Sequence, residues 1–257
     1  MNQTALITGA SAGLGAEFAR QLAAQGMSIV LVARRREPME ALADELRQSH
    51  GVDVEVLVAD MTDPDTPAWL LAETQARNLQ VDYLVNNAGS EGPDLIKTRN
   101  WPRNDAYLRL MMTSVAAMCH EFIPGMVERG YGRVLNVASV AGRMTVGGDY
   151  SYGPTKAYLI ALSKGLASAC KPQGVHVMAL CPGFTHTEFH VSEKLTAMKQ
   201  ATPAFAWYDA DVVVREGLAA LEKGRDEYTS GRLYRFLVPI LRQRWSRGLL
   251  KVLGVRL

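Results

Sequence analysis

"TALITGASAGLG", residues 4–15, opens the chain with a short apolar run, a glycine-rich turn and the start of a helix. The helical pattern continues through "GLGAEFARQLAAQG" (13–26) and stops at a glycine. The glycines of the turn leave room for a pyrophosphate to approach the backbone, and the helix points its N-terminus at that anion. A strand, a glycine turn and a helix in this order favour a dinucleotide site over a turn that serves packing alone.

The same alternation continues through the first two thirds of the chain. Helical patterns such as 37–51 lie between further apolar runs at 28–33, 54–60, 81–87, 132–139 and 175–183. Continuous apolar strands that alternate with helices predict a parallel sheet covered on both faces. We therefore predict an α/β fold, a single doubly wound domain over residues 1–257, with its ligand crevice at the carboxyl ends of the strands.

Composition narrows the class of protein. The 257 residues suit one domain, and 48% hydrophobic with 21% charged residues is a globular profile. A net charge of +2 gives no reason to expect a nucleic-acid partner. The three cysteines lie far apart and have no metal spacing, which favours a reducing, cytoplasmic location and no metal site. We find neither a signal-peptide pattern nor an apolar run of about 18 residues.

The end of the second predicted strand bears on the choice of cofactor. Many dinucleotide sites place an acid there to bind the ribose hydroxyls, but here Ala33 is followed by Arg34, Arg35 and Arg36. No carboxylate repels a 2′-phosphate, and arginine binds phosphate with paired hydrogen bonds. The sequence therefore favours NADP(H) over NAD(H), with Arg34 as the best-placed arginine. The alternative is a solvated basic start to the second helix.

Several motifs in order resemble the short-chain dehydrogenase/reductase family over nearly the whole chain. They are the glycine motif "TGASAGLG" (8–15), "VAD" ending at Asp60, "NNAG" (86–89), "NVAS" (136–139), "YGPTK" (152–156) and "CPGFTHTEF" (181–189). Each motif alone is weak, but their order and spacing are specific. The resemblance implies a Rossmann fold, hydride transfer between a nicotinamide and a substrate carbon, and a homodimer or homotetramer.

The resemblance also implies roles for individual residues. Ser139 would bind the substrate oxygen, Tyr152 would exchange its proton, and Lys156 would support Tyr152 and hold the nicotinamide ribose. The residues expected to contact the cofactor are Gly9, Ser11, Ala12, Gly13, Leu14, Gly15, Arg34, Asp60, Asn86, Tyr152, Lys156 and Thr187. Thr187 occupies the position that usually contacts the nicotinamide amide.

The spacing of Tyr152 and Lys156 has a physical reading of its own. Residues i and i+4 share one face of a helix, so both side chains point the same way. Pro154 fits because the first helical turn has no intrahelical N–H partners to lose. A free tyrosine titrates near pH 10, and a nearby ammonium is expected to lower that pKa and favour proton exchange.

One position departs from the family pattern. The family usually has an asparagine thirteen residues before the proline of a "PxM" motif, and counting back from Pro124 gives Met111. The asparagine is thought to seat a water that links the lysine to solvent, and a methionine cannot anchor a water firmly. Either the proton relay is rebuilt or turnover is slow.

The last third of the chain carries a predicted substrate loop and an amphipathic tail. The loop spans about 184–208; Phe205, Trp207 and Tyr208 either line an apolar pocket or pack the loop down, and "HTEFH" (186–190) lacks the order of a zinc helix. The tail at about 232–257 has basic and apolar residues but no acid, so it predicts a docked helix or, alternatively, a membrane-surface contact.

Together these features predict an NADP(H)-dependent oxidoreductase that interconverts an alcohol and a ketone or aldehyde. An apolar small-molecule substrate is expected, such as a ketoacyl, steroid-like or aromatic carbonyl compound. The main alternative is a non-catalytic NADP(H)-binding sensor or scaffold on the same fold, since fold alone does not settle function.

Overall fold

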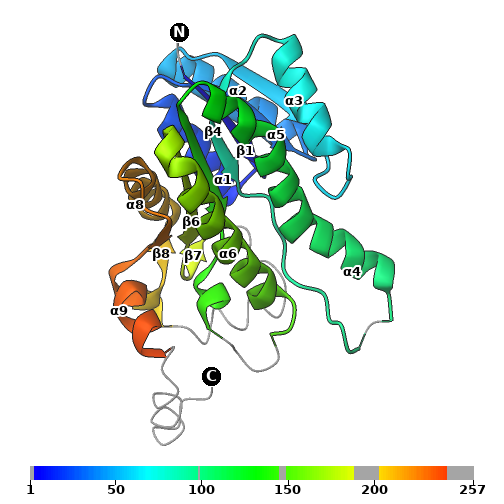
Figure 1. Cartoon of the computed structure of the whole chain (residues 1–257), viewed down its shortest axis with the longest axis vertical. Coiled ribbons are helices and arrows are strands. Elements are labelled where there is room, and N and C mark those ends of the chain that lie inside the picture. Colours follow the sequence, from blue (N-terminus) through cyan, green and yellow to red (C-terminus); the bar gives the residue numbers. More distant parts are fainter. Residues whose placement is uncertain (1–2, 98, 145–148, 188–202, 242–257) are drawn as a thin grey trace, which may run out of the picture.

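The computed structural model describes residues 3–97, 99–144, 149–187 and 203–241, and a seven-stranded parallel sheet forms its centre (Figure 1). The strand order is β3-β2-β1-β4-β5-β6-β9, so the order reverses between β1 and β4. The strands are β1 (Thr4–Thr8), β2 (Ser28–Ala33), β3 (Val54–Val58), β4 (Val81–Asn86), β5 (Gly132–Val137), β6 (Val175–Cys181) and β9 (Glu227–Thr229). A small parallel pair, β7 (Thr185–His186) and β8 (Tyr208–Asp209), lies outside the main sheet.

Helices cover both faces of the sheet. One face is packed by α1 (Gly13–Ala23), α2 (Arg36–His50) and α8 (Ala210–Glu222), and the other by α3 (Thr66–Ala76), α5 (Ser114–Glu128) and α6 (Tyr152–Cys170). Among the described residues, the other helical elements are α4 (Trp101–Leu108), α9 (Arg232–Leu241), the π-helical turn η1 (Arg109–Thr113) and the 3-10 turns η2 (Val140–Arg143), η3 (Lys171–Gln173) and η5 (Ala204–Ala206).

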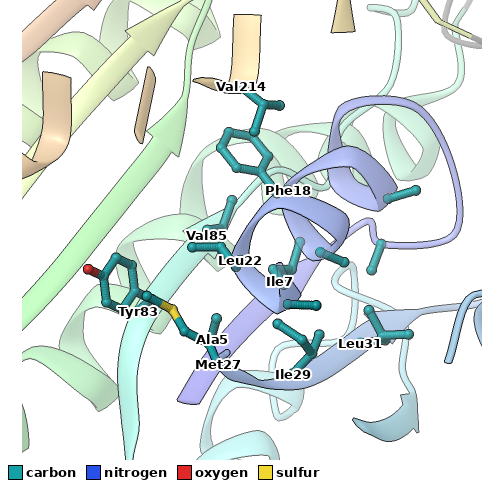
Figure 2. Packing of buried hydrophobic residues seen from close by; sticks show 14 of the residues in the cluster. Ala5, Ile7, Phe18, Leu22, Met27, Ile29, Leu31, Tyr83, Val85 and Val214 are labelled. Atoms are coloured by element: carbon teal, nitrogen blue, oxygen red, sulfur yellow. The ribbon is translucent and has the colours of Figure 1, made fainter. Parts of the chain in front are cut away.

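The continuous apolar strands result from burial on both faces. In β1, Ile7 joins the cluster that contains Phe18 of α1 and Val214 of α8, as Figure 2 shows. Its neighbour Leu6 points the other way, into the cluster that contains Met118 of α5. Successive side chains of a strand alternate between faces, so a strand covered on both sides must be apolar at every position. This arrangement confirms the predicted doubly wound α/β fold.

The predicted strands all occur, with ends that differ by at most two residues from the apolar runs. The seventh strand, β9, was not predicted, because its sequence "EYT" carries no apolar run. It pairs in parallel with β6 and completes that edge of the sheet. The prediction of a single domain for residues 1–257 stays a prediction, since the structure does not describe the whole tail.

One helical stretch, Trp101–Glu128, is long and apolar enough by length and composition to cross a membrane. The sequence itself shows no uninterrupted apolar run of about 18 residues. In the structure the stretch is divided into α4, the turn η1 and α5. The side chains of Met118, Phe122 and Met126 in α5 pack into the core on the face of the sheet that α3, α5 and α6 cover. α5 therefore serves as a core helix of the folded domain.

The first part of the predicted tail helix is docked on the domain. α9 begins at Arg232, as expected, and its Tyr234 and Val238 are buried. Arg235 Nη1 forms an ion pair with Glu216 of α8, 2.9 Å away. These residues are docked on the domain, whereas the rest of the predicted tail, 242–257, lies outside the described residues, so the choice between docking and membrane contact for the tail stays a prediction.

Candidate active site

The glycine turn between β1 and α1 has a backbone that only glycine suits. Gly9 and Gly13 have φ angles of +67° and +56°, in the left-handed region. A Cβ atom on Gly15 would lie 2.2 Å from the carbonyl oxygen of Gly9, so a side chain there would collide with the turn. The turn is held in this compact form without side chains that could block an approaching ligand.

The start of α1 fits a pyrophosphate. Its N-cap residue, Ala12, has no side-chain oxygen to cap the helix, and the first turn contains no acid. The first N–H groups of a helix have no intrahelical partners and carry partial positive charge. The side chain of Leu14 packs against the core, which leaves its backbone facing the turn. The turn from Gly9 to Gly15 and the uncapped start of α1 therefore fit an anion such as the pyrophosphate of a dinucleotide.

The arginines after β2 differ in their contacts. Arg35 Nη2 donates a hydrogen bond to Ser11 Oγ in the glycine turn, at 3.1 Å. Arg34, favoured by the sequence analysis, points instead toward Asp60, with 3.9 Å between Nη1 and Oδ2, and both side chains are exposed. Asp60 follows β3, and its Oδ1 accepts a hydrogen bond from the N–H of Thr62. The structure thus brings Arg35 to the glycine turn and Arg34 to the predicted adenine-side aspartate.

The second asparagine of "NNAG" holds this motif against the glycine turn. Asn87 Nδ2 donates to the carbonyl oxygens of Thr8 and Gly9, at 3.0 and 3.3 Å. The side chain of Asn86, the predicted cofactor residue, is buried and donates to Asn136 of β5 at 2.8 Å. Asn87 was not predicted, and only the register at the end of β4 shows which asparagine contacts the turn.

Ser139, Tyr152 and Lys156 converge at the carboxyl edge of the sheet. Ser139 follows β5, caps the turn η2 and hydrogen-bonds the Tyr152 hydroxyl. Tyr152 is the first residue of α6, and Lys156 Nζ lies one turn along, 5.5 Å from the centre of the tyrosine ring. Lys156 is buried, and its Nζ donates to the carbonyl oxygen of Val137 at 2.7 Å. The three predicted residues therefore lie together, with Ser139 at the start of η2 and both Tyr152 and Lys156 in the first turns of α6.

Two contacts fix the start of α6 and hence Tyr152. Asp149 Oδ2 accepts the N–H of Gly153 at 2.8 Å, which satisfies one donor of the first helical turn. Ser151 Oγ donates to the carbonyl oxygen of Pro93 in the loop after β4. This loop also approaches so closely at Gly92 that a Cβ there would lie 2.6 Å from Ser151. The loop after β4 therefore packs against the start of α6, next to Tyr152.

Burial controls the protonation of the triad. It raises the pKa of the Tyr152 hydroxyl, and the hydrogen bond from Ser139 lowers it by less. Burial also lowers the pKa of Lys156 from 10.5 to about 8. The expectation that the ammonium lowers the pKa of Tyr152 is therefore wrong for this structure, because Lys156 Nζ is turned toward Val137 and desolvation dominates. Tyr152 is a protonated acid at neutral pH.

Met111 lies in the π-helical turn η1, which interrupts the path from α4 to α5. Its side chain is buried, and its Sδ accepts the N–H of Ser90, directly after "NNAG", at 3.4 Å. A Cβ on Gly89 would lie 3.3 Å from the same sulfur. The thioether thus holds the loop after β4 in place, a role that the sequence did not reveal.

We expect Met111→Leu to weaken this attachment, because leucine keeps the apolar volume but leaves the Ser90 N–H without its acceptor. This hydrogen bond is only partly buried, and a net hydrogen bond contributes about 0.5–1.5 kcal/mol, so the free energy of unfolding should fall by about 1 kcal/mol or less. Met111→Asn, which restores an oxygen acceptor and an amide, should retain the fold and raise turnover if proton supply limits it. Urea unfolding and steady-state turnover measure the two effects; equal stability of the native chain and Met111→Leu would contradict the assigned role of the sulfur.

Thr187 brings the segment after β6 to the glycine turn. A Cβ on Gly13 would lie 3.2 Å from the Cβ of Thr187, so the two residues are in close approach. Thr187 is the last described residue before 203, and much of the predicted substrate loop, with His190, lies outside the described residues. Within the described part, Trp207 is buried and stacks between Phe184 and His186, whereas Phe205 is exposed.

Comparisons with known proteins show the family and the fold of the chain. The sequence profile of the short chain dehydrogenase family matches residues 3–197. The 3-oxoacyl-[acyl-carrier-protein] reductase FabG of Escherichia coli is 34% identical over 187 residues, 72% of this chain and 74% of that protein. A short-chain dehydrogenase from Sphingobium yanoikuyae in complex with NADPH superposes with a TM-score of 0.79 and 29% identity, over 97% of this chain and 95% of the other. A bulky-bulky ketone specific alcohol dehydrogenase from Comamonas testosteroni gives 0.77 and 26%, over 97% and 94%.

Proposed function

The chain belongs to the short-chain dehydrogenase family and is an NAD(P)-dependent oxidoreductase, and we propose that it interconverts an apolar ketone or aldehyde and its alcohol with NADP(H). The observation that carries this proposal is the assembly of Ser139, Tyr152 and Lys156 at the carboxyl edge of the sheet, next to the glycine turn. A non-catalytic binding protein has no need for a buried lysine near a tyrosine ring whose hydroxyl is hydrogen-bonded to serine.

In this proposal each residue of the triad has a separate task. Ser139 donates a hydrogen bond to the substrate oxygen, and Tyr152 moves a proton to or from that oxygen. Lys156 would hold the nicotinamide ribose, and Thr187 the nicotinamide amide. When bound, the nicotinamide supplies or accepts the hydride. Because burial keeps the Tyr152 hydroxyl protonated at neutral pH, the residue is prepared to donate a proton, which suits carbonyl reduction.

The preference for NADP(H) over NAD(H) rests on the end of β2. Ala33 removes the acid that would repel a 2′-phosphate, and Arg35 already reaches the glycine turn through Ser11. Arg34 lies on the adenine side, near Asp60. The relative from Sphingobium yanoikuyae was solved with NADPH, which supports the same choice. Arg35 is therefore the proposed main phosphate ligand, with Arg34 as a second.

We expect Arg35→Ala to weaken NADPH binding by about 10- to 100-fold and to change NADH binding little, because a hydrogen bond to a charged group contributes about 1.5–3 kcal/mol. Arg34→Ala should have a smaller effect of the same kind. Arg36→Ala is the matched control, since Arg36 pairs with Glu40 along α2. Fluorescence titration of both cofactors measures all three variants; equal affinity of the native protein for NADH and NADPH would refute the preference.

The proposed substrates are ketoacyl, steroid-like or aromatic carbonyl compounds. The similar proteins include one named for 3-oxoacyl groups and one for bulky ketones, which supports this class. A panel of such carbonyl compounds, followed by NADPH absorbance, tests the proposal. If the protein binds NADPH tightly but reduces no member of the panel, the sensor or scaffold alternative replaces it. A cytoplasmic location and a homodimer or homotetramer stay predictions.

A further inference from the structure

Tyr234 of α9 lies against the segment that leads from β6 to Thr187. Its ring covers Gly183 so closely that a Cβ there would lie 2.0 Å from the ring. Its hydroxyl accepts the N–H of Phe184 at 3.3 Å and donates to the carbonyl oxygen of Ala206 at 2.8 Å. One buried side chain thus joins the residues on both sides of the segment 187–203.

These two sides of the segment are also paired with each other. β7 and β8 run parallel, with Thr185 opposite Tyr208, and the N–H of Tyr208 donates to the carbonyl oxygen of Phe184 at 3.0 Å. A ladder with two residues in each strand is short and has little stability of its own. The ladder therefore depends on contacts from outside: α8 packs against both strands, and α9 adds the hydrogen bond from Tyr234 to Ala206 (Figure 1).

The attachment of α9 is reciprocal. The hydroxyl of Tyr208 accepts the N–H of Leu233 at 3.2 Å and so satisfies a donor in the first turn of α9. Arg235 fixes the same turn through Glu216 of α8. α9 consequently has a fixed position from which Tyr234 can hold the segment that carries Thr187 to the glycine turn.

We propose that Tyr234 is a positioning residue for the nicotinamide end of the cofactor site, acting through Gly183–Thr187. This inference rests on the proposed function, because it assigns Thr187 to the nicotinamide side. Tyr234 lies beyond residue 197, where the match to the family profile ends. Tyr234 packs on Gly183, whereas the arginines of the adenine side follow β2, so its effect should be confined to one half of the cofactor.

Tyr234→Phe tests the proposal, since it keeps the ring over Gly183 and removes only the hydroxyl. A net hydrogen bond contributes about 0.5–1.5 kcal/mol, so NADPH binding should weaken by about 3- to 10-fold. Adenosine 2′,5′-bisphosphate, which has the adenine end but no nicotinamide, should bind the variant as it binds the native protein. The measurements are NADPH fluorescence and calorimetry with the bisphosphate, on the full chain without substrate.

Tyr228→Phe is the matched control. The Tyr228 hydroxyl accepts a hydrogen bond from Arg235, so its loss also loosens α9, whereas the hydrogen bonds to Phe184 and Ala206 come from Tyr234. This variant should bind NADPH as the native protein does. Equal weakening in both variants would overturn the proposal, because α9 would then act only through general stability. Unchanged NADPH binding in Tyr234→Phe would also overturn it.

The bisphosphate separates a failure of this inference from a failure of the proposed function. If the native protein binds the bisphosphate and NADPH, the NADP(H) assignment stands whatever Tyr234→Phe does. If the native protein binds neither, the proposed function fails and the inference fails with it. Weaker binding of both ligands to Tyr234→Phe, by the same factor, would overturn the inference alone, since the effect would not be confined to the nicotinamide end.

Discussion

Tyr152→Phe is expected to lower turnover by about 100- to 10,000-fold while NADPH binding changes little. The substitution keeps the ring at the start of α6 and removes only the hydroxyl that Ser139 holds. General acid–base catalysis by a positioned side chain typically contributes a factor of this size. Lys156, which is assigned to the ribose, keeps its hydrogen bond to Val137, so the cofactor site is not expected to change.

Steady-state turnover on any accepted carbonyl, together with NADPH titration, measures this effect. Tyr150→Phe is the matched control, because it removes a hydroxyl two residues away that donates to Asp94. The control should keep near-native turnover. Near-native turnover of Tyr152→Phe would show that the catalytic assignment is wrong, whereas a loss of NADPH binding would mean that the substitution disturbs the site as a whole.

The raised pKa of Tyr152 bears on the direction of the reaction. In reduction the hydroxyl gives a proton to the developing alkoxide, and burial keeps that proton in place at neutral pH. In oxidation the phenolate must form first, which burial disfavours. We therefore expect the rate of alcohol oxidation to increase with pH more steeply than the rate of ketone reduction decreases near neutrality.

Much of the fold could be predicted because strands that are buried on both faces appear in the sequence as continuous apolar runs. The first six strands are short apolar runs, and each ends where a polar or glycine motif begins. β9 has no such run, since Glu227 and Tyr228 are only partly buried at the edge of the sheet. Its pairing with β6 is decided by the surrounding structure, which overrides the weak local preference of three residues.

The sequence located the site to within one residue but did not show which of two neighbouring residues contacts the glycine turn. The motifs indicated an asparagine and an arginine near the glycine turn, but adjacent positions point in different directions. Backbone geometry therefore places Asn87 and Arg35 at the turn, while Asn86 and Arg34 turn elsewhere. Tyr234 left no signal, because α9 reaches Gly183 only through tertiary packing.

Lys156→Met should impair both cofactor binding and turnover, since the lysine is assigned to the nicotinamide ribose and lies near the ring of Tyr152. We expect turnover to fall by about 100-fold or more. Lys164→Met is the matched control: Lys164 lies two turns further along α6, is half-exposed and pairs with Glu227 at 2.6 Å. Turnover and NADPH titration of both variants separate the role of Lys156 from that of any lysine on this helix.

The same substitution should change stability in a way that depends on pH. Burial lowers the pKa of Lys156 to about 8 in the folded chain, from 10.5 for an exposed lysine. Between these values the unfolded chain binds more protons than the folded chain, so the free energy of unfolding rises with pH. Below pH 8 Lys156 is protonated in both the folded and the unfolded chain. The free-energy cost of burying its charge is then at its full value and does not change with pH.

Lys156→Met lacks this contribution, so the native protein should gain stability relative to the variant as the pH rises from about 8 to 10.5. Urea unfolding of the native protein, Lys156→Met and Lys164→Met across this range measures the difference. Parallel stability curves for the native protein and Lys156→Met would contradict the depressed pKa. Suppose that the native protein gains stability relative to Lys156→Met as the pH rises, and that the variant also loses turnover. The domain would then retain a destabilising buried charge because the reaction requires a lysine near Tyr152.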